Sequence, residues 1–178
     1  TRYFTYVVNS KIETPEHNRQ MIMALEGLGD ALFARGLFQE ATKIFEQLSS
    51  SSEPNEVRLR ALRKAATSSR WGGDFMHSLQ LANQATEYAS FDSLEYARVR
   101  LQKGMILGLG GKADEGLNEL EEALKVFEEE YVLLDTAFTM IQAAGLYVNK
   151  FETEKALRMT CYSLALYEEL KDLHGQAE

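Results

Sequence analysis

The strongest constraint on the fold is a helix-turn-helix pattern that recurs along the chain. Its clearest copy reads Leu25-x2-Leu28-Gly29-x2-Leu32, then the turn Gly36-Leu37-Phe38, then Ala41-x3-Phe45. Leucines three and four residues apart line one face of a helix, and the glycine between them lets a second helix approach closely. The pattern therefore predicts two short helices that pack against each other and need neighbours to cover their remaining apolar surface.

Three further copies follow when the chain is aligned on the turn. The matching turns are Gly73-Asp74-Phe75, Gly111-Lys112-Ala113 and Asn149-Lys150-Phe151. A small residue follows each turn, at intervals of 37, 38 and 40 residues along the chain: Ala41, Ser78, Gly116 and Ala156. The fourth copy has two extra residues between its turn and the small residue. The periodicity predicts an all-α fold with helices near 15–35, 38–50, 54–70, 75–90, 93–109, 114–130, 134–149 and 154–171.

The first copy resembles the tetratricopeptide repeat (TPR), with leucine where that family often has tryptophan and tyrosine. The resemblance covers residues 15–178 and implies a right-handed superhelical solenoid of about four TPR-like helical hairpins. The implied units are 15–52, 54–90, 92–131 and 133–171, followed by the start of a further repeat. The phrases at 123–129 and 162–172 resemble the longer repeats of kinesin light chain, LGN-type adaptors and the C-terminal arrays of signal-transduction ATPases.

Residues 1–12 are rich in aromatic and β-branched side chains, which suit a strand, but beside helical repeats we expect the last helix of a preceding unit. The sequence begins with Thr1 rather than methionine, so we expect a fragment of a larger protein.

Composition narrows the classes of partner. The 178 residues are 45% hydrophobic and 26% charged, the balance of a packed protein, and only two are proline. The net charge of −8 disfavours nucleic acid and anionic membrane surfaces as partners. We find no apolar run of membrane-spanning length and no signal peptide, so a cytoplasmic location is expected. A single cysteine, Cys161, excludes an internal disulfide and a cysteine-rich zinc site.

Catalytic and cofactor motifs are not assembled in this sequence. The three histidines stand apart from one another, and Cys161 is expected to pack as a small apolar residue. The run Gly108–Ala113 lacks the first glycine and the final Ser/Thr of a phosphate-binding loop, so we interpret it as a turn between helices. The acids between Asp114 and Glu130 alternate with leucines at helical spacing, which predicts a solvated outer face. No enzyme activity, cofactor or metal is expected.

The TPR resemblance implies a concave groove formed by the second, fifth, ninth and twelfth positions of each unit. In the fourth unit these are the apolar or small residues Phe138, Ile141, Gly145 and Val148. In the second unit they are largely basic, and the segment 58–70 holds five basic residues and no acid. The predicted binding residues are Arg60, Arg63, Thr67, Arg70, Arg98, Leu101, Met105, Phe138 and Ile141.

Arginines in a groove suit carboxylates or phosphate, so the predicted ligand has an acidic end and an apolar end. The alternative is that these arginines pair with Glu26, Asp30 or other acids of neighbouring helices and stabilise the stack. We therefore predict a non-enzymatic module that binds a protein or peptide in its groove. A second hypothesis is an effector-sensing or autoinhibitory segment of a regulatory ATPase. Uncapped terminal repeats also raise the alternative of a homodimer.

Overall fold

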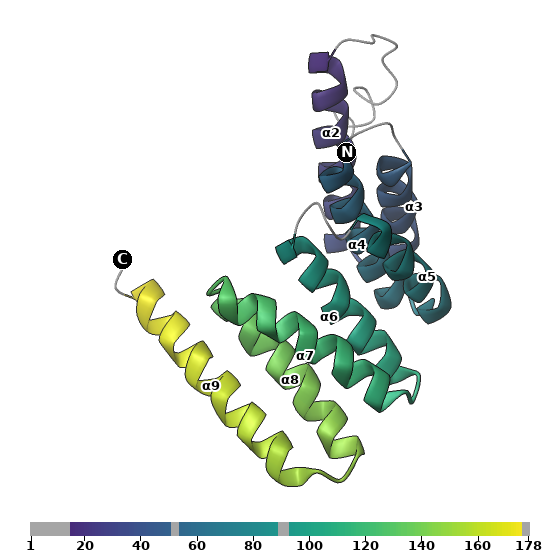
Figure 1. Cartoon of the computed structure of the whole chain (residues 1–178). Helices are drawn as coiled ribbons and strands as arrows, with labels where there is room; N and C mark the ends of the chain where they lie inside the picture. Colours follow the sequence, from purple (N-terminus) through teal and green to yellow (C-terminus); the bar gives the residue numbers. More distant parts are fainter. Residues whose placement is uncertain (1–14, 51–53, 89–92, 176–178) are drawn as a thin grey trace. The chain divides into compact units, whose positions relative to one another are not determined.

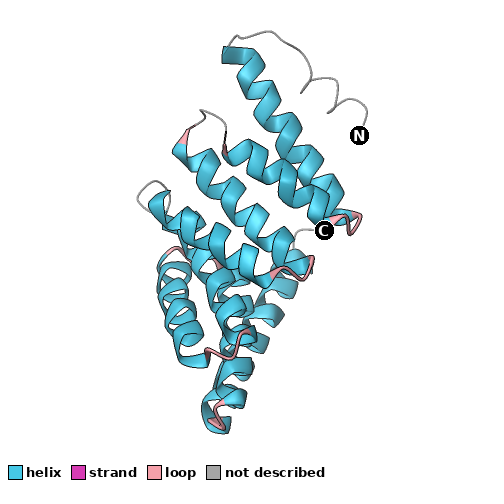
Figure 2. Ribbon diagram, turned by 90° about the vertical axis from the view of Figure 1, so that its right-hand side faces the viewer, coloured by secondary structure: helices cyan, strands magenta, loops and turns pink. Residues whose placement is uncertain are grey.

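The computed structural model describes residues 15–50, 54–88 and 93–175, which form eight α-helices and one short 3-10 helix. Figure 2 shows these residues as helices and loops only. The all-α class and the four helical hairpins predicted from the sequence are confirmed. The segment 1–12 and the expected ends of the first two repeat units, at residues 52 and 90, lie outside the described residues.

The chain divides into two compact units, residues 1–92 and 93–178, and each is described by itself. The helices of the N-terminal unit are α2 (Pro15–Ala34), α3 (Phe38–Ser49), α4 (Asn55–Trp71) and α5 (Phe75–Ala85), followed by the 3-10 helix η1 (Thr86–Tyr88). The helices of the C-terminal unit are α6 (Ser93–Leu109), α7 (Ala113–Glu129), α8 (Leu133–Asn149) and α9 (Thr153–Gly175). In both units each helix packs against the next one along the chain (Figure 1).

Most helix ends fall within one residue of the predicted positions, with two exceptions. α5 ends five residues before the predicted end, because the Thr86 hydroxyl donates to the Asn83 carbonyl and the chain tightens into η1. α9 continues through Gly175, four residues beyond the predicted end. A further repeat beyond the fourth unit stays a prediction.

The turns within the hairpins share one backbone geometry. Gly36, Gly73 and Gly111 have φ of 75°, 85° and 79°, the left-handed conformation that glycine adopts readily at the end of a helix. In the fourth hairpin this place is taken by Phe151, with φ of 62°. The turn was predicted two residues too early, at Asn149. With Phe151 as its first residue the turn precedes Ala156 by five residues, as in the other three copies, and the apparent insertion disappears.

Close helix crossings explain the glycines inside helices. In the N-terminal unit, a Cβ atom placed on Gly29 would lie 2.4 Å from the ring of Phe45, a residue that is 1% exposed. The predicted close approach of the second helix at Gly29 is confirmed. In the C-terminal unit, the backbones of α6 and α7 approach so closely at Gly104 and Gly116 that a Cβ on either would lie within 3 Å of the other's carbonyl oxygen.

Candidate functional site

The basic face of α4 is neutralised, at least in part, by acids of α2. Arg60 donates from Nε and Nη2 to the two carboxylate oxygens of Glu26, at 2.8 and 3.0 Å. Such a two-bond pairing matches the planar guanidinium to the carboxylate and fixes both side chains. The alternative in which these arginines pair with acids of a neighbouring helix is therefore confirmed for Arg60.

Lys64 extends the same network by one turn. Its ammonium lies 2.9 Å from Glu26 Oε1 and 2.8 Å from Asp30 Oδ2. Burial alone would raise the pKa of Glu26, but the hydrogen bonds and charges of Arg60 and Lys64 outweigh it, so the pKa is lowered. Glu26 is thus held ionised between two cations, and this surface is less positive than the run of bases in the sequence suggested.

The remaining predicted residues of α4 are half-buried. The Thr67 hydroxyl donates to the Arg63 carbonyl of its own helix, which satisfies its polar group locally. The Arg70 guanidinium lies 5.3 Å from the centre of the Trp71 ring, and burial lowers its pKa. Arg70 is therefore held against its own helix end, where the ring and the cation attract each other.

Arg98, on α6, bridges to α8 within the C-terminal unit. Its guanidinium contacts Asp135 Oδ2 at 2.9 Å and the buried carboxylate of Glu95 at 3.3 Å. Burial alone would lower the pKa of Arg98, but the hydrogen bonds that Arg98 donates to Asp135 and Glu95 outweigh burial, so the pKa is raised. As with Arg60, the charge serves a contact between two first helices of adjacent hairpins.

The two apolar residues predicted on α6 are not freely exposed. Leu101 is only 4% exposed and belongs to the hydrophobic core of the C-terminal unit, and Met105 packs half-buried against that core. Gly108, the next position of this face, has Leu146 of α8 where its own Cβ would be. Neighbouring helices thus cover much of the α6 face.

α8 carries the apolar surface that the sequence placed in the fourth unit. Leu134, Phe138, Ile141 and Val148 are 59%, 37%, 43% and 58% exposed, and we call them the α8 stripe. Their spacing of four, three and seven residues puts them on one face of the helix. Gly145 lies on the same face, with open space where its Cβ would be. Phe138 and Ile141 are exposed as expected, whereas Leu134 was not among the predicted residues and lies one turn before them.

The described histidine and cysteine side chains do not form a catalytic group. His77 Nε2 lies 2.9 Å from Glu46 Oε1, and the backbone N–H of His77 donates to Asp74, which caps α5. Cys161 is exposed, so the expectation that it packs as a buried apolar residue was wrong, because α9 leaves that face open. Among the side chains that the structure describes, no three of His, Cys, Asp or Glu are grouped as metal ligands would be.

The glycine-rich run and the acidic run have structural roles. Gly111 and Lys112 form the turn from α6 to α7, as predicted. On α7, Glu119 pairs with Arg100 and Lys103, and Glu121 accepts a 2.8 Å hydrogen bond from the Tyr147 hydroxyl. None of the helices in the described part of the chain is long and apolar enough to cross a membrane.

Comparison with known proteins supports the fold. No protein-family model and no curated protein matches the chain. Among solved structures, BtubC (BKLC) from P. vanneervenii matches with a TM-score of 0.75 and 14% identity, covering 94% of this chain and 69% of that one. MamA gives 0.68 and 13%, covering 96% and 88%. YrrB, described as a TPR protein with an unusual peptide-binding site, gives 0.62 and 20%, covering 99% and 83%.

The chain has the TPR fold. At identities of 13 to 20%, these likenesses show the fold alone, so a binding partner has to be argued from the side chains of this chain. The two units differ in these side chains. In the N-terminal unit, ion pairs join α2 and α4, the first helices of the two hairpins. In the C-terminal unit, Arg98 joins α6 to α8 in the same way, and α8 also exposes the α8 stripe.

Proposed function

We propose that this chain is a non-enzymatic interaction module and that it binds a segment of a partner protein on the α8 stripe. The observation that carries the proposal is the α8 stripe, four apolar side chains exposed along one face of a single helix. Exposed apolar side chains scattered singly are ordinary, whereas a contiguous row of them marks an interaction surface.

The repeat itself does not require this apolar row. At the corresponding positions of α4 the chain places Arg60, Arg63 and Arg70, so a soluble first helix can be built with charges there. The exposed part of these four side chains brings no stability to the chain alone, since burial is what makes apolar surface favourable. A partner that covers them supplies that burial.

Polar groups at the end of the stripe favour a particular orientation. Arg98 and Asp135 meet near the start of α8, beside Leu134, and form a charged border to an otherwise apolar face. Border charges contribute more to association rate and orientation than to affinity. The apolar part of the predicted ligand therefore fits on the stripe, next to this border.

Removing the two most exposed stripe residues tests the proposal. In the variant Leu134→Gln/Val148→Gln both side chains stay helix-compatible, and since each is more than half exposed the fold should be retained. We expect a partner captured by the wild-type chain to be lost, at a cost of about 1–3 kcal/mol for two apolar contacts.

The matched control is Met76→Gln on α5, where an exposed side chain (71%) is changed in the same way. Met76→Gln should retain the partner. Equal capture by the wild type and the double variant, with unchanged circular dichroism, would remove the stripe from the binding site. Loss of capture in both variants would show that exposed apolar surface is bound without specificity.

A second candidate, self-association through α9, rests on a different comparison. Leu157 and Leu164 of α9 occupy the same places after Ala156 that Leu117 and Leu124 of α7 occupy after Gly116. The α7 pair is 5% and 6% exposed, while the α9 pair is 63% and 58% exposed. α7 is followed by α8, which packs against it, and the corresponding face of α9 is open.

An exposed apolar helix face in a repeat array is normally covered by a polar cap or another subunit. Light scattering across a concentration series should show a dimer in the wild type that Leu157→Gln/Leu164→Gln converts to monomer. A monomer at all concentrations in the wild type would end this second candidate and leave the α8 proposal untouched.

A further inference from the structure

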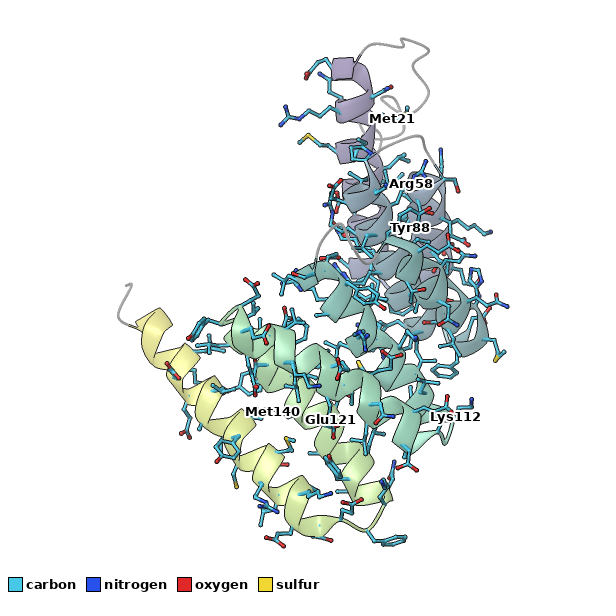
Figure 3. The ribbon with its side chains drawn as sticks, in the orientation of Figure 1. Met21, Arg58, Tyr88, Lys112, Glu121 and Met140 are labelled. Atoms are coloured by element: carbon cyan, nitrogen blue, oxygen red, sulfur yellow. The ribbon has the colours of Figure 1, made fainter. Side chains whose placement is uncertain are left out.

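A hollow of about 280 Å³ lies within the C-terminal unit, away from the α8 stripe. It is bounded by the end of α7, the first half of α8 and the second half of α9; Met140, on its α8 wall, is labelled in Figure 3. Its lining is mostly apolar and includes Phe127 of α7, Leu133 and Met140 of α8, and Ala165 and Leu166 of α9.

The apolar character of its α9 wall is a departure from the repeat. Counted from the small residue after each turn, Tyr162 and Ala165 of α9 correspond to Glu122 and Lys125 of α7. On α7 these two positions carry a solvent-exposed ion pair. On α9 the same positions are uncharged and line the hollow. The repeat therefore tolerates charges there, and α9 replaces them with a tyrosine and an alanine.

Charge at the hollow has one sign. Among the lining residues that the structure describes, the charged ones are both acidic: Glu128 on α7 and Glu169 on α9. The net charge of the whole chain is −8, which favours the approach of a cationic ligand. Two exposed tyrosine rings, of Tyr131 (85%) and Tyr162 (65%), stand at the same place and can receive a cation on their faces.

The volume indicates what fills the hollow. Pockets that enclose whole drug-sized ligands or cofactors hold about 300–1,000 Å³, so 280 Å³ suits one bulky side chain better than a complete cofactor. Protein interfaces are commonly anchored by a single aromatic residue or arginine seated in such a pocket.

We propose that this hollow binds a basic, aromatic segment of a partner protein, with one aromatic side chain inside and flanking arginines facing Glu128 and Glu169. The inference is independent of the proposed function, because its lining residues on α8, Leu133, Thr136 and Met140, are not members of the α8 stripe. It gives the chain a second recognition surface with the opposite charge preference to the ligand expected from the basic face of α4.

The test uses the full chain, labelled with ¹⁵N, and two defined probes. The tripeptide amides acetyl-Arg-Trp-Arg and acetyl-Glu-Trp-Glu are titrated while backbone amide shifts are followed by NMR. We expect the arginine peptide to shift amides of the hollow, such as those of Met140 and Leu166, saturably. The glutamate peptide should bind at least about tenfold more weakly, because two attractive charge pairs become repulsive.

Two variants and one matched control locate the site. Ala165→Trp fills the hollow, and Glu169→Lys reverses one of its charges. Each substitution should weaken binding of the arginine peptide about fivefold or more. Glu154→Lys makes the same change of net charge on the same helix, at a carboxylate that is 85% exposed and does not line the hollow. It should leave binding unchanged, and the amide spectrum of each variant reports whether the fold is intact.

The remaining outcomes overturn the proposal. Shifts located elsewhere, equal binding of both peptides, or no effect of Ala165→Trp and Glu169→Lys would each show that the hollow is not the binding site. Equally tight binding of tryptamine would make it a small-molecule site. Shifts of the same amides on dilution without peptide would make it a contact between two copies of the chain. A failure here leaves the Leu134→Gln/Val148→Gln test of the α8 stripe unaffected.

Discussion

The crossing of α6 and α7 yields the sharpest stability prediction. A Cβ on Gly104 would lie 2.6 and 2.7 Å from Cγ and Cδ2 of Leu120, and 2.9 Å from the carbonyl oxygen of Gly116. Carbon atoms in contact sit about 3.5–4.0 Å apart, so Gly104→Ala requires a displacement of about 1 Å. Leu120 is 0% exposed and the carbonyl belongs to a helix backbone, so the two helices themselves must separate.

The magnitude is best measured against Gly145→Ala. Overpacking in a core costs about 1–3 kcal/mol, and the immovable carbonyl places Gly104→Ala near the upper end. Replacing a helical glycine by alanine also gains about 1 kcal/mol. Gly145 lies in the middle of α8 with open space around its Cβ position, so Gly145→Ala shows this gain alone. We expect the two variants to differ by about 2–3 kcal/mol, with Gly104→Ala the less stable.

Urea denaturation followed by circular dichroism gives both free energies of unfolding, and an unchanged slope confirms that the same surface is exposed. Repeating Gly104→Ala in a Leu120→Ala background should reduce the penalty, because the side-chain clash is gone, without abolishing it, because the carbonyl of Gly116 remains. Equal stability of Gly104→Ala and Gly145→Ala would refute the close crossing.

Three further predictions follow from side-chain contacts. Glu26→Gln should lower stability by about 1 kcal/mol at neutral pH. Since the folded pKa of Glu26 is lowered, its contribution is present above the unfolded pKa and is lost as pH falls through the folded value, which urea titrations from pH 7 to 3 would show. Phe151→Gly should raise the melting temperature, because glycine relieves about 1 kcal/mol of left-handed backbone strain. The Phe151 ring is 93% exposed, so little packing is lost. A lower melting temperature would contradict the turn geometry. Burial and the hydrogen bond to Glu121 raise the pKa of Tyr147 to about 12, so ultraviolet titration should find a late-titrating phenol that Tyr147→Phe removes.

The sequence predicted the fold well because the repeat is written in local patterns. Glycine turns, small residues five positions later and leucines at helical spacing each report on one hairpin, and together they set nearly every helix boundary. The fourth turn was misplaced because its left-handed position holds Phe151, a residue type that gives no turn signal. Backbone geometry imposed by the packing of α8 and α9 overrides the local preference there.

The surface was harder to predict than the fold. The sequence showed the bases of α4, but the pairing of Arg60 with Glu26 joins residues 34 positions apart and depends on how two hairpins stack. The exposure of Phe138 and Ile141 followed from their repeat positions. The hollow beside Met140 was not predicted, because its lining comes from three helices and depends on how they pack. The signal that points to it is the uncharged Tyr162 and Ala165, at positions that carry an ion pair on α7.

The central claim is that a partner chain lies along the α8 stripe, and site-specific photocrosslinking tests it most directly. A benzophenone amino acid placed at Ile141, in the middle of the stripe, should form a covalent adduct with the bound partner on irradiation. The same group at Met76 on α5 should form none. An adduct from Met76 together with none from Ile141 would contradict the account.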